Sequence, residues 1–241
     1  MAYLKGSDKS KYVASMFGRI SSRYDFLNTV MTAGRHHVWR KIAVDTVLDG
    51  FSEGIALDVA TGTGDFAIEL ARSDSLSVVG LDFSSDMIFV GQNKILKKGI
   101  GHRVSNLVGD AHMLPFADKT FVCATVGFGV RNFIDLPTAI REIARVLQPG
   151  GRIVILEIVR IEKGIFRYLF KPYFKYVTPW IGAVFAGDKE AYTYLPQSVE
   201  LFLSAREMLE LMLEIGMEDV SIKEFALGSV AIVSGRKARG L

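Results

Sequence analysis

The 241-residue sequence has few of the groups that extracellular, metal-binding and membrane-spanning proteins need. Its single cysteine, Cys123, excludes a disulfide framework and a cysteine-based metal site. It has no uncharged apolar run of the length that crosses a bilayer, and its first residues lack the apolar stretch of a signal peptide. The net charge of +3 is small for a dedicated nucleic-acid-binding protein. These absences predict a soluble, cytoplasmic protein with no metal and no nucleic-acid partner.

Charge is unevenly distributed along the chain. Residues 1–41 carry +6 and residues 160–176 carry +4, which leaves −7 on the rest. Apolar residues make up 49% of the chain, enough for a sizeable core, and the length fits a single domain over 1–241. Two segments lie outside the regular pattern described next. They are the helical N-terminal residues 1–50 and an insert at 160–200.

From residue 55 onward, short apolar runs alternate with helical stretches. Near-continuous apolar strands separated by helices indicate a parallel sheet that is covered on both faces. The helices end at recognisable signals, such as Pro149-Gly150-Gly151 after the third one. Strands are expected at 55–60, 77–82, 104–108, 121–128 and 152–159, and helices at 64–73, 84–98 and 135–147.

The C-terminal part differs from this pattern. Ser204 and Glu207 form a capping box for a helix over 204–215, and two strands follow at 218–225 and 229–235. The three residues between these strands permit a hairpin but not a crossover helix, so the last strand is expected to run antiparallel to its neighbour. The predicted fold class is therefore α/β: a three-layer, Rossmann-like, seven-stranded, mostly parallel sheet with an antiparallel last strand, as in class I methyltransferases.

A glycine-rich turn follows the first predicted strand, in the sequence DVATGTGD (58–65). Gly62 and Gly64 let the backbone pass close to a ligand, and the next helix offers free N–H groups there. Twenty residues beyond Gly62, Asp82 ends the second strand, where a carboxylate can accept both hydroxyls of a ribose. The glycine spacing also satisfies a dinucleotide fingerprint, and Asp82 by itself can be a solvated strand-end carboxylate.

Three further features favour S-adenosylmethionine (SAM) over a dinucleotide. Asp58 stands just before the loop, where a carboxylate can order the loop and face the ammonium group of SAM. Asp110-Ala111 follow the third strand, where an adenine amine needs an acceptor. The chain also has no Tyr-x-x-x-Lys pair of the kind used in hydride transfer.

With these motifs in place, the chain resembles the ubiquinone/menaquinone biosynthesis C-methyltransferases (UbiE/MenG), a family of class I SAM-dependent enzymes. The resemblance runs from about Lys11 to Lys237. Its most specific blocks are YDFLN (24–28), continued by Gly34, His36 and Trp39, and the stretch FGVRNF (128–133). One departure concerns His37, which stands where the family usually has Arg and is expected to affect contacts with the substrate. Further matching blocks are LDVATGTGD (57–65), GLDFSSDM (80–87), GDAHMLPFAD (109–118), RVLQPGG (145–151), YTYL (192–195) and SV (198–199).

The resemblance implies SAM as co-substrate, with Thr63, Asp82, Asp110 and Ala111 in contact with it. The full set of expected cofactor-binding residues is Asp58, Thr61, Gly62, Thr63, Gly64, Asp82, Asp110 and Ala111.

Methylation of an aromatic carbon needs an ionised or nearly ionised ring hydroxyl, a group that takes up its proton and a donor that stabilises the oxyanion. Arg131 and Asn132 follow the fourth strand, beside the cofactor, and the family resemblance implies that this pair lies at the substrate ring. Tyr24 can relay a proton or pack on that ring, Asp25 can orient it, and His36 can act as a base.

Each of these candidates also has a structural interpretation. Arg131 can cap the helix that begins near Asp135. Tyr24 and Asp25 can be a helix-end motif that holds the N-terminal cover down. His36 can be a histidine packed near Trp39. Asp188, in the insert, is a weaker candidate.

Basic residues at every fourth position from Lys163 to Lys175 lie beside an aromatic and aliphatic face, a pattern of helices at anionic membrane interfaces. The same segment can instead be a lid helix with solvated lysines. The combined prediction is an enzyme that methylates a ring carbon of a polyprenyl quinol, either demethylmenaquinol or the ubiquinone precursor, with peripheral contact at the inner face of the cell membrane. A methyltransferase for another lipid or phenolic acceptor, a nucleotide-dependent oxidoreductase, a non-catalytic scaffold and a homo-oligomeric state all stay open.

Overall fold

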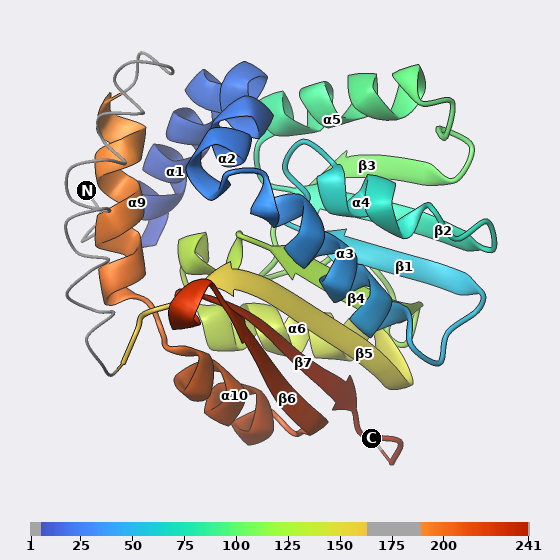
Figure 1. Ribbon diagram of the computed structural model, residues 1–241. Helices are drawn as coiled ribbons and strands as arrows, with labels where there is room; N and C mark the ends of the chain where they lie inside the picture. Colours follow the sequence, from blue (N-terminus) through green and yellow to red (C-terminus); the bar gives the residue numbers. More distant parts are fainter. Residues whose placement is uncertain (1–5, 163–188, 241) are drawn as a thin grey trace.

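A seven-stranded sheet forms the centre of the computed structural model, which describes residues 6–162 and 189–240 (Figure 1). The strand order is β3-β2-β1-β4-β5-β7-β6. Only β7 runs antiparallel to its neighbours, β5 and β6, so the predicted fold class is confirmed. The strands are β1 (Gly54–Val59), β2 (Leu76–Asp82), β3 (Val104–Val108), β4 (Phe121–Gly127), β5 (Leu147–Ile158), β6 (Met217–Phe225) and β7 (Val230–Lys237).

Helices cover both faces of the sheet, giving three layers (Figure 1). On one face, Val44 of α3 and Phe66 of α4 share a buried cluster with Val154 of β5. On the other face, Ile140 of α6 and Met208 of α10 lie in a second cluster. These layers bury the apolar strand runs that the sequence pattern identified. The covering helices are α3 (Arg35–Leu48), α4 (Asp65–Leu70), α5 (Ser85–Lys97), α6 (Leu136–Val146) and α10 (Ala205–Glu214).

Local signals set most of the element boundaries. The predicted capping box is present at the start of α10, with Ser204 and Glu207 bonded to each other's backbone N–H. The predicted start of the fifth strand at residue 152 is wrong, because β5 already begins at Leu147, which pairs with Phe121. The glycines after Pro149 lie within a register shift of the strand instead of a separate turn. The helix α4 is also shorter than the predicted range of 64–73.

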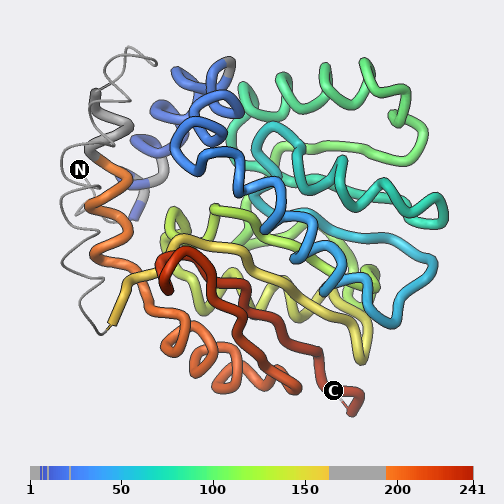
Figure 2. The backbone as a smooth tube through the Cα atoms, in the orientation of Figure 1, coloured from blue at the N-terminus to red at the C-terminus, as the bar shows by residue number. Residues whose placement is uncertain are grey.

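The N-terminal helices divide between two roles. Trp39 and Val47 of α3 are buried on the sheet face, whereas α1 (Gly6–Ile20) and α2 (Tyr24–Thr32) lie over the carboxyl ends of the parallel strands (Figure 1). There α1 meets α9 (Lys189–Leu201) from the far end of the chain, as the blue and orange segments of Figure 2 show. Met16 and Tyr194 share a small third core between them.

The basic stripe predicted between Lys163 and Lys175, and Asp188, lie outside the described residues. Within the part of the chain that is described, none of the helices has the length and apolar character needed to cross a membrane.

Candidate active site

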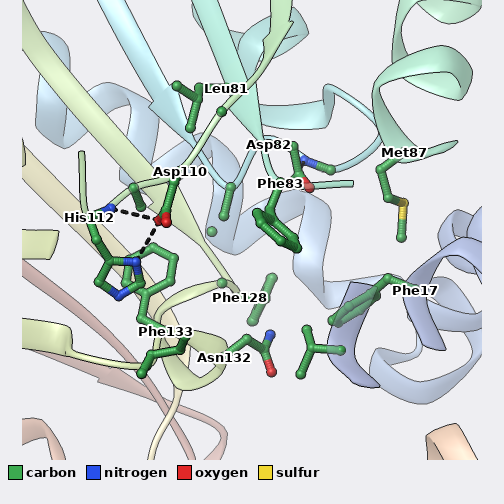
Figure 3. Close-up of a pocket in the computed structure, with 18 of the residues that line it drawn as sticks. Phe17, Leu81, Asp82, Phe83, Met87, Asp110, His112, Phe128, Asn132 and Phe133 are labelled. Carbon is green, nitrogen blue, oxygen red and sulfur yellow. Dashed lines mark hydrogen bonds and ion pairs between the residues drawn. The ribbon is translucent and has the colours of Figure 1, made fainter. Parts of the chain in front are cut away.

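A cavity with about 810 Å³ of empty space lies where β1, β2 and β4 end, roofed by Val13 and Phe17 of α1. In Figure 3 the carboxylates of Asp82 and Asp110 lie on one side of this cavity, and Asn132 and Phe17 lie on the other. The strand ends and the N-terminal cover thus enclose a space with acidic groups on one wall. We refer to it as the first cavity.

Gly62 brings the glycine-rich loop to the wall of the first cavity. Its φ of +56° is in the left-handed region, and a Cβ built on it meets no protein atom within 4 Å. Its N–H donates to Oδ2 of Asp82 at 2.8 Å. The backbone therefore leaves room for a ligand where a side chain would otherwise project.

Asp82 is held in the cavity wall by backbone donors. Besides Gly62, the N–H of Ser84 donates to its other carboxylate oxygen, Oδ1, at 2.9 Å. Burial raises the pKa of Asp82, although these backbone hydrogen bonds oppose the shift. These backbone donors do not use all the acceptor positions of the carboxylate, so the group can still accept a hydroxyl donor from a ribose.

Asp110 and the buried Ala111 also line the first cavity. The Oδ1 atom of Asp110 accepts from the backbone N–H of His112 at 2.9 Å and lies 2.6 Å from the ring Nδ1 of that histidine (Figure 3). Burial alone would raise the pKa of Asp110, but the hydrogen bonds from His112 lower it. The other ring nitrogen of His112 accepts from the N–H of Asp135 at 3.1 Å, which places the ring proton on Nδ1. The sequence reasoning missed His112 as an orienting residue, although it stands directly after Asp110-Ala111.

Asp58 lies beneath the cavity wall, fully buried. It accepts hydrogen bonds from the hydroxyls of Thr61 at 2.6 Å and Thr125 at 2.7 Å, and from the N–H of Ala67 at 3.1 Å. Burial raises its pKa to about 7 against these bonds. Asp58 therefore orders the loop from below, and its predicted contact with the ammonium group of SAM stays a prediction.

Thr63 and Gly64 do not line the first cavity either. The buried hydroxyl of Thr63 donates to Asp25 at 2.6 Å, and the other oxygen of Asp25 pairs with Lys94 at 2.7 Å. Gly64, at φ +80°, caps the start of α4. Asp25 thus joins α2 to the glycine-rich loop, which agrees with the interpretation that it holds the cover down.

A second cavity, with about 700 Å³ of empty space, adjoins the first. Four residues line both cavities and form the boundary between them: Phe17, Tyr24, Phe128 and Asn132. The rest of the lining of the second cavity is apolar apart from a few polar groups, namely Asn28, Thr32, His36, Arg131 and Tyr194. It has the character of a site for a largely apolar molecule with a few oxygen atoms.

Arg131, in the short helical turn η2 (Val130–Asn132), is buried and paired with Glu157 of β5. Burial lowers the pKa of its guanidinium to about 10, which still leaves Arg131 protonated at neutral pH. Glu157 was missed by the sequence reasoning. The available signal was one acidic residue within the apolar run 152–159.

Asn132 is oriented by Tyr194 of α9, whose hydroxyl donates to its Oδ1 at 3.0 Å. The amide nitrogen is therefore the group that Asn132 can offer to the cavities. Tyr24 packs edge-on against Phe17, with ring centres 5.8 Å apart, and burial raises the pKa of its hydroxyl. Both tyrosines are neutral at physiological pH.

His36 lines the second cavity and is buried. Burial, followed by the neighbouring Arg40 and His37, lowers its pKa to about 4. The hydroxyl of Thr32 donates to the carbonyl of Asn28 at 2.7 Å and lies 2.7 Å from Nδ1 of His36, so Nδ1 carries the ring proton. A neutral His36 can accept a hydrogen bond at Nε2, but it is too weak a base to keep a proton at pH 7.

His37, the departure from the family pattern, lines neither cavity. Its ring lies against His36, with centres 3.9 Å apart. Cys123 is buried in the sheet core. No cluster of three or more potential metal ligands occurs among residues 6–162 and 189–240.

The family model of the ubiE/COQ5 methyltransferase family matches residues 5–237. The chain belongs to this family. It is 38% identical over 234 residues to the ubiquinone/menaquinone biosynthesis C-methyltransferase UbiE of Geobacter sulfurreducens, a match that covers 96% of this chain and 90% of that protein. It is 41% identical over 231 residues to the demethylmenaquinone methyltransferase of Roseiflexus castenholzii, covering 95% and 94% of the two chains.

Among solved structures, a SAM-dependent methyltransferase from Thermotoga maritima has the same fold, with a TM-score of 0.64 at 19% identity over 92% of this chain and 98% of that one. As a member of the ubiE/COQ5 methyltransferase family, the protein uses SAM as its methyl donor. The first cavity fits this co-substrate, because the unoccupied Cβ position of Gly62 and the carboxylate of Asp82 face the same space.

Proposed function

We propose that this protein transfers a methyl group from SAM to a ring carbon of a demethylated polyprenyl quinol, either demethylmenaquinol or the corresponding ubiquinone precursor. The names of the relatives support this substrate class, since one is a demethylmenaquinone methyltransferase and another acts in ubiquinone and menaquinone biosynthesis. An apolar second cavity with a few polar groups suits a quinol ring that carries an isoprenoid chain.

The observation that carries the proposal is the boundary shared by the two cavities. A ring in the second cavity would face the first across Phe17, Tyr24, Phe128 and Asn132. Methyl transfer by in-line displacement requires the methyl group of the donor and the ring carbon of the acceptor to be in direct contact, without intervening water, and two adjoining cavities allow such contact. Three aromatic side chains at the boundary suit both the exclusion of water and the alignment of a flat ring.

When bound, SAM supplies an electrophilic methyl group on a sulfonium, which becomes a neutral thioether as the methyl–sulfur bond breaks; the methylated ring carbon then loses its own proton to water and the ring regains its aromaticity. The residues of this chain have to make the ring carbon electron-rich, which requires a ring oxygen close to its ionised form. In our proposal, Arg131 and the amide nitrogen of Asn132 donate hydrogen bonds to that oxygen and stabilise its negative charge. His36 accepts a hydrogen bond from a ring hydroxyl at Nε2, and Tyr24 packs on the ring.

In the first cavity, Asp82 would accept the ribose hydroxyls and Asp110, with Ala111 beside it, would accept the adenine amine. Gly62 would allow close approach, while Asp58, Thr61, Thr63 and Gly64 would hold the loop in shape. Asp25 would keep the cover closed over both ligands.

We also propose that the enzyme is cytoplasmic and meets the inner face of the cell membrane, where a polyprenyl quinol resides. The excess of +6 on residues 1–41 and +4 on residues 160–176 supports attraction to anionic lipids. Sedimentation with anionic vesicles at low and high salt tests this, because binding that is absent or indifferent to salt would contradict it.

A radiolabelled-methyl assay tests the reaction directly. Reduced menaquinone-type and ubiquinone-type acceptors with short prenyl chains are compared side by side, with SAM in excess. Label on the ring carbon of at least one acceptor is the expected result. Binding of SAM without methylation of either quinol, together with methylation of an unrelated phenol or lipid, would instead assign the protein to another acceptor.

A further inference from the structure

Glu157 is an ionisable residue in the middle of the sheet. It lies one residue before the end of β5, between β4 and β7, and is only 1% exposed. Its carboxylate accepts hydrogen bonds from the guanidinium of Arg131, from the backbone N–H of Arg131 at 3.3 Å and from the backbone N–H of Ile158 at 2.7 Å. One side chain thus holds both the charged group and the backbone of Arg131.

Placing a charge in such a position is unfavourable unless it is paired and hydrogen-bonded. Glu157 lines neither cavity, so it cannot touch a substrate. Its bonds lead to Arg131 and to its own strand. Any effect of the Glu157 carboxylate on the reaction must therefore act through Arg131.

Arg131 has N–H groups that Glu157 does not use. The guanidinium is bonded to Glu157 through Nη1, and its Nε is buried with no hydrogen-bond partner among the described residues. An unpartnered donor in a buried group is costly, and it points to an acceptor that arrives with a ligand. The side chain lines the second cavity, where a ring oxygen would be that acceptor.

A competing position for Arg131 lies in a neighbouring groove. Arg131 also lines a surface groove that contains the carboxylates of Glu207, Glu210 and Glu214 of α10. Glu207 is paired with Arg160 at 2.6 Å and Glu210 with Arg206 at 3.0 Å, so Glu214 is the carboxylate there that can attract the Arg131 guanidinium. Without Glu157, the side chain has an electrostatic reason to leave the second cavity and no buried charge to hold it there.

We propose that Glu157 is a positioning residue for methyl transfer: it fixes Arg131 with its unused N–H groups facing the acceptor ring. This inference rests on the proposed function and adds a residue that acts only through Arg131. Lys9 supports the same turn, since its ammonium group donates to the carbonyls of Arg131 at 3.2 Å and Phe133 at 2.9 Å. The backbone of η2 is thus held by Lys9 as well as by Glu157.

The test is a double-mutant cycle with Glu157→Gln, Arg131→Gln and the combined variant, measured with SAM and a reduced quinol that the wild-type protein methylates. Arg131→Gln is expected to lower kcat by roughly a hundredfold, as loss of an oxyanion donor does. Glu157→Gln is expected to lower kcat by roughly tenfold or more, with the Kd for SAM within about threefold of the wild-type value. The combined variant should match Arg131→Gln within about threefold, because a positioning residue has no effect once its target is gone.

Glu142→Gln provides the matched control. Glu142 also pairs with an arginine, Arg145 at 2.8 Å, and also accepts a backbone N–H, that of Leu114 at 2.9 Å, but it lies outside both cavities. The kcat of Glu142→Gln should stay within about twofold of the wild-type value, since this partly exposed ion pair contacts neither cavity. Calorimetric SAM binding identifies which variants are folded.

Two results would overturn the inference. One is a Glu157→Gln variant with wild-type kcat. The other is a combined variant whose kcat falls below that of Arg131→Gln by the same factor that Glu157→Gln alone produces. If Glu157→Gln does not fold, Glu157→Asp decides: lower kcat at unchanged SAM affinity supports the role, and unchanged kcat refutes it. Absence of wild-type activity on every quinol would instead count against the proposed function.

Discussion

The hydroxyl of Thr63 donates a 2.6 Å hydrogen bond to the carboxylate of Asp25, across 38 positions of the sequence. This bond connects the glycine-rich loop to α2, and Lys94 strengthens the connection by pairing with the second carboxylate oxygen of Asp25. The N-terminal cover is therefore fastened to the loop that forms the wall of the first cavity. Ligand binding and cover position should be coupled through this contact.

Asp25→Ala should weaken SAM binding more than it slows methyl transfer. The carboxylate is 41% exposed, so its ion pair with Lys94 contributes only modestly, and loss of the whole contact should raise the Kd for SAM by roughly three- to tenfold. Isothermal titration and steady-state kinetics give the two quantities. Asp45→Ala, on the exposed side of α3, is the control. A large loss of kcat at unchanged SAM affinity would instead give Asp25 a direct part in the chemistry.

Asp82→Ala should nearly abolish SAM binding. Hydrogen bonds to a charged group contribute about 1.5–3 kcal/mol each, so losing two ribose contacts should raise the Kd by roughly a hundredfold or more. Asp82→Asn retains one acceptor oxygen and should lose less. Calorimetry measures both variants, and an affinity within about threefold of the wild-type value in Asp82→Ala would refute the ribose assignment.

Asp58 should make folding stability depend on pH. Burial raises its pKa from 3.8 to about 7 in the folded protein, so the folded state holds a proton that the unfolded chain has released. This contribution to stability is present below pH 4 and is lost as the pH rises toward 7, by up to about 1.4 kcal/mol per pH unit.

The comparison with Asp58→Asn isolates this effect, because the asparagine cannot take up the proton. The free energy of unfolding is measured with urea at pH 5 and at pH 8. On going from pH 8 to pH 5, the free energy of unfolding of the wild-type protein should increase by at least about 1 kcal/mol more than that of the variant. A difference that does not change with pH would show that Asp58 stays ionised. SAM affinity of the variant is expected to fall as well, since Asp58 holds the loop in shape through Thr61 and Ala67.

Phe128→Gly should separate stability from activity. Phe128 has φ +55°, a conformation that costs a non-glycine residue about 1–2 kcal/mol, so glycine relieves strain while losing the packing of a half-buried ring. The melting temperature should change by only a few degrees, whereas turnover should fall by roughly tenfold or more because the boundary between the cavities opens. Ala226→Gly, at φ +48° and outside both cavities, should relieve strain without loss of activity. Wild-type turnover in Phe128→Gly would show that the ring is dispensable.

Much of the fold follows from local patterns. The apolar runs and their spacing predicted all seven strands. The short link between the last two predicted the antiparallel β7, because a hairpin is the only connection that so short a link allows. The early start of β5 could not be predicted. Pro149-Gly150-Gly151 is a turn signal by itself, and only the pairing of Leu147 with Phe121 extends the strand across it.

The residues of the candidate active site also fall into a predictable and an unpredictable group. Its cofactor half comes from short motifs at strand ends, and the topology of a parallel sheet brings such ends together, so Gly62, Asp82 and Asp110 could be selected from the sequence. Side-chain contacts between segments far apart in the sequence could not be predicted. Arg131 pairs with Glu157 on β5, and Tyr194 of α9 orients Asn132.

By itself, therefore, the sequence determined the sheet, the cofactor loop and the kind of chemistry, because these depend on local periodicity and on residues close together in the chain. The tertiary structure alone decided which groups reach the cavities and which support them. Asp58 and Thr63 stand within the loop motif yet point away from the first cavity, toward Thr125 and Asp25. Such directions depend on how distant segments pack against the loop, and no local pattern in the chain encodes them.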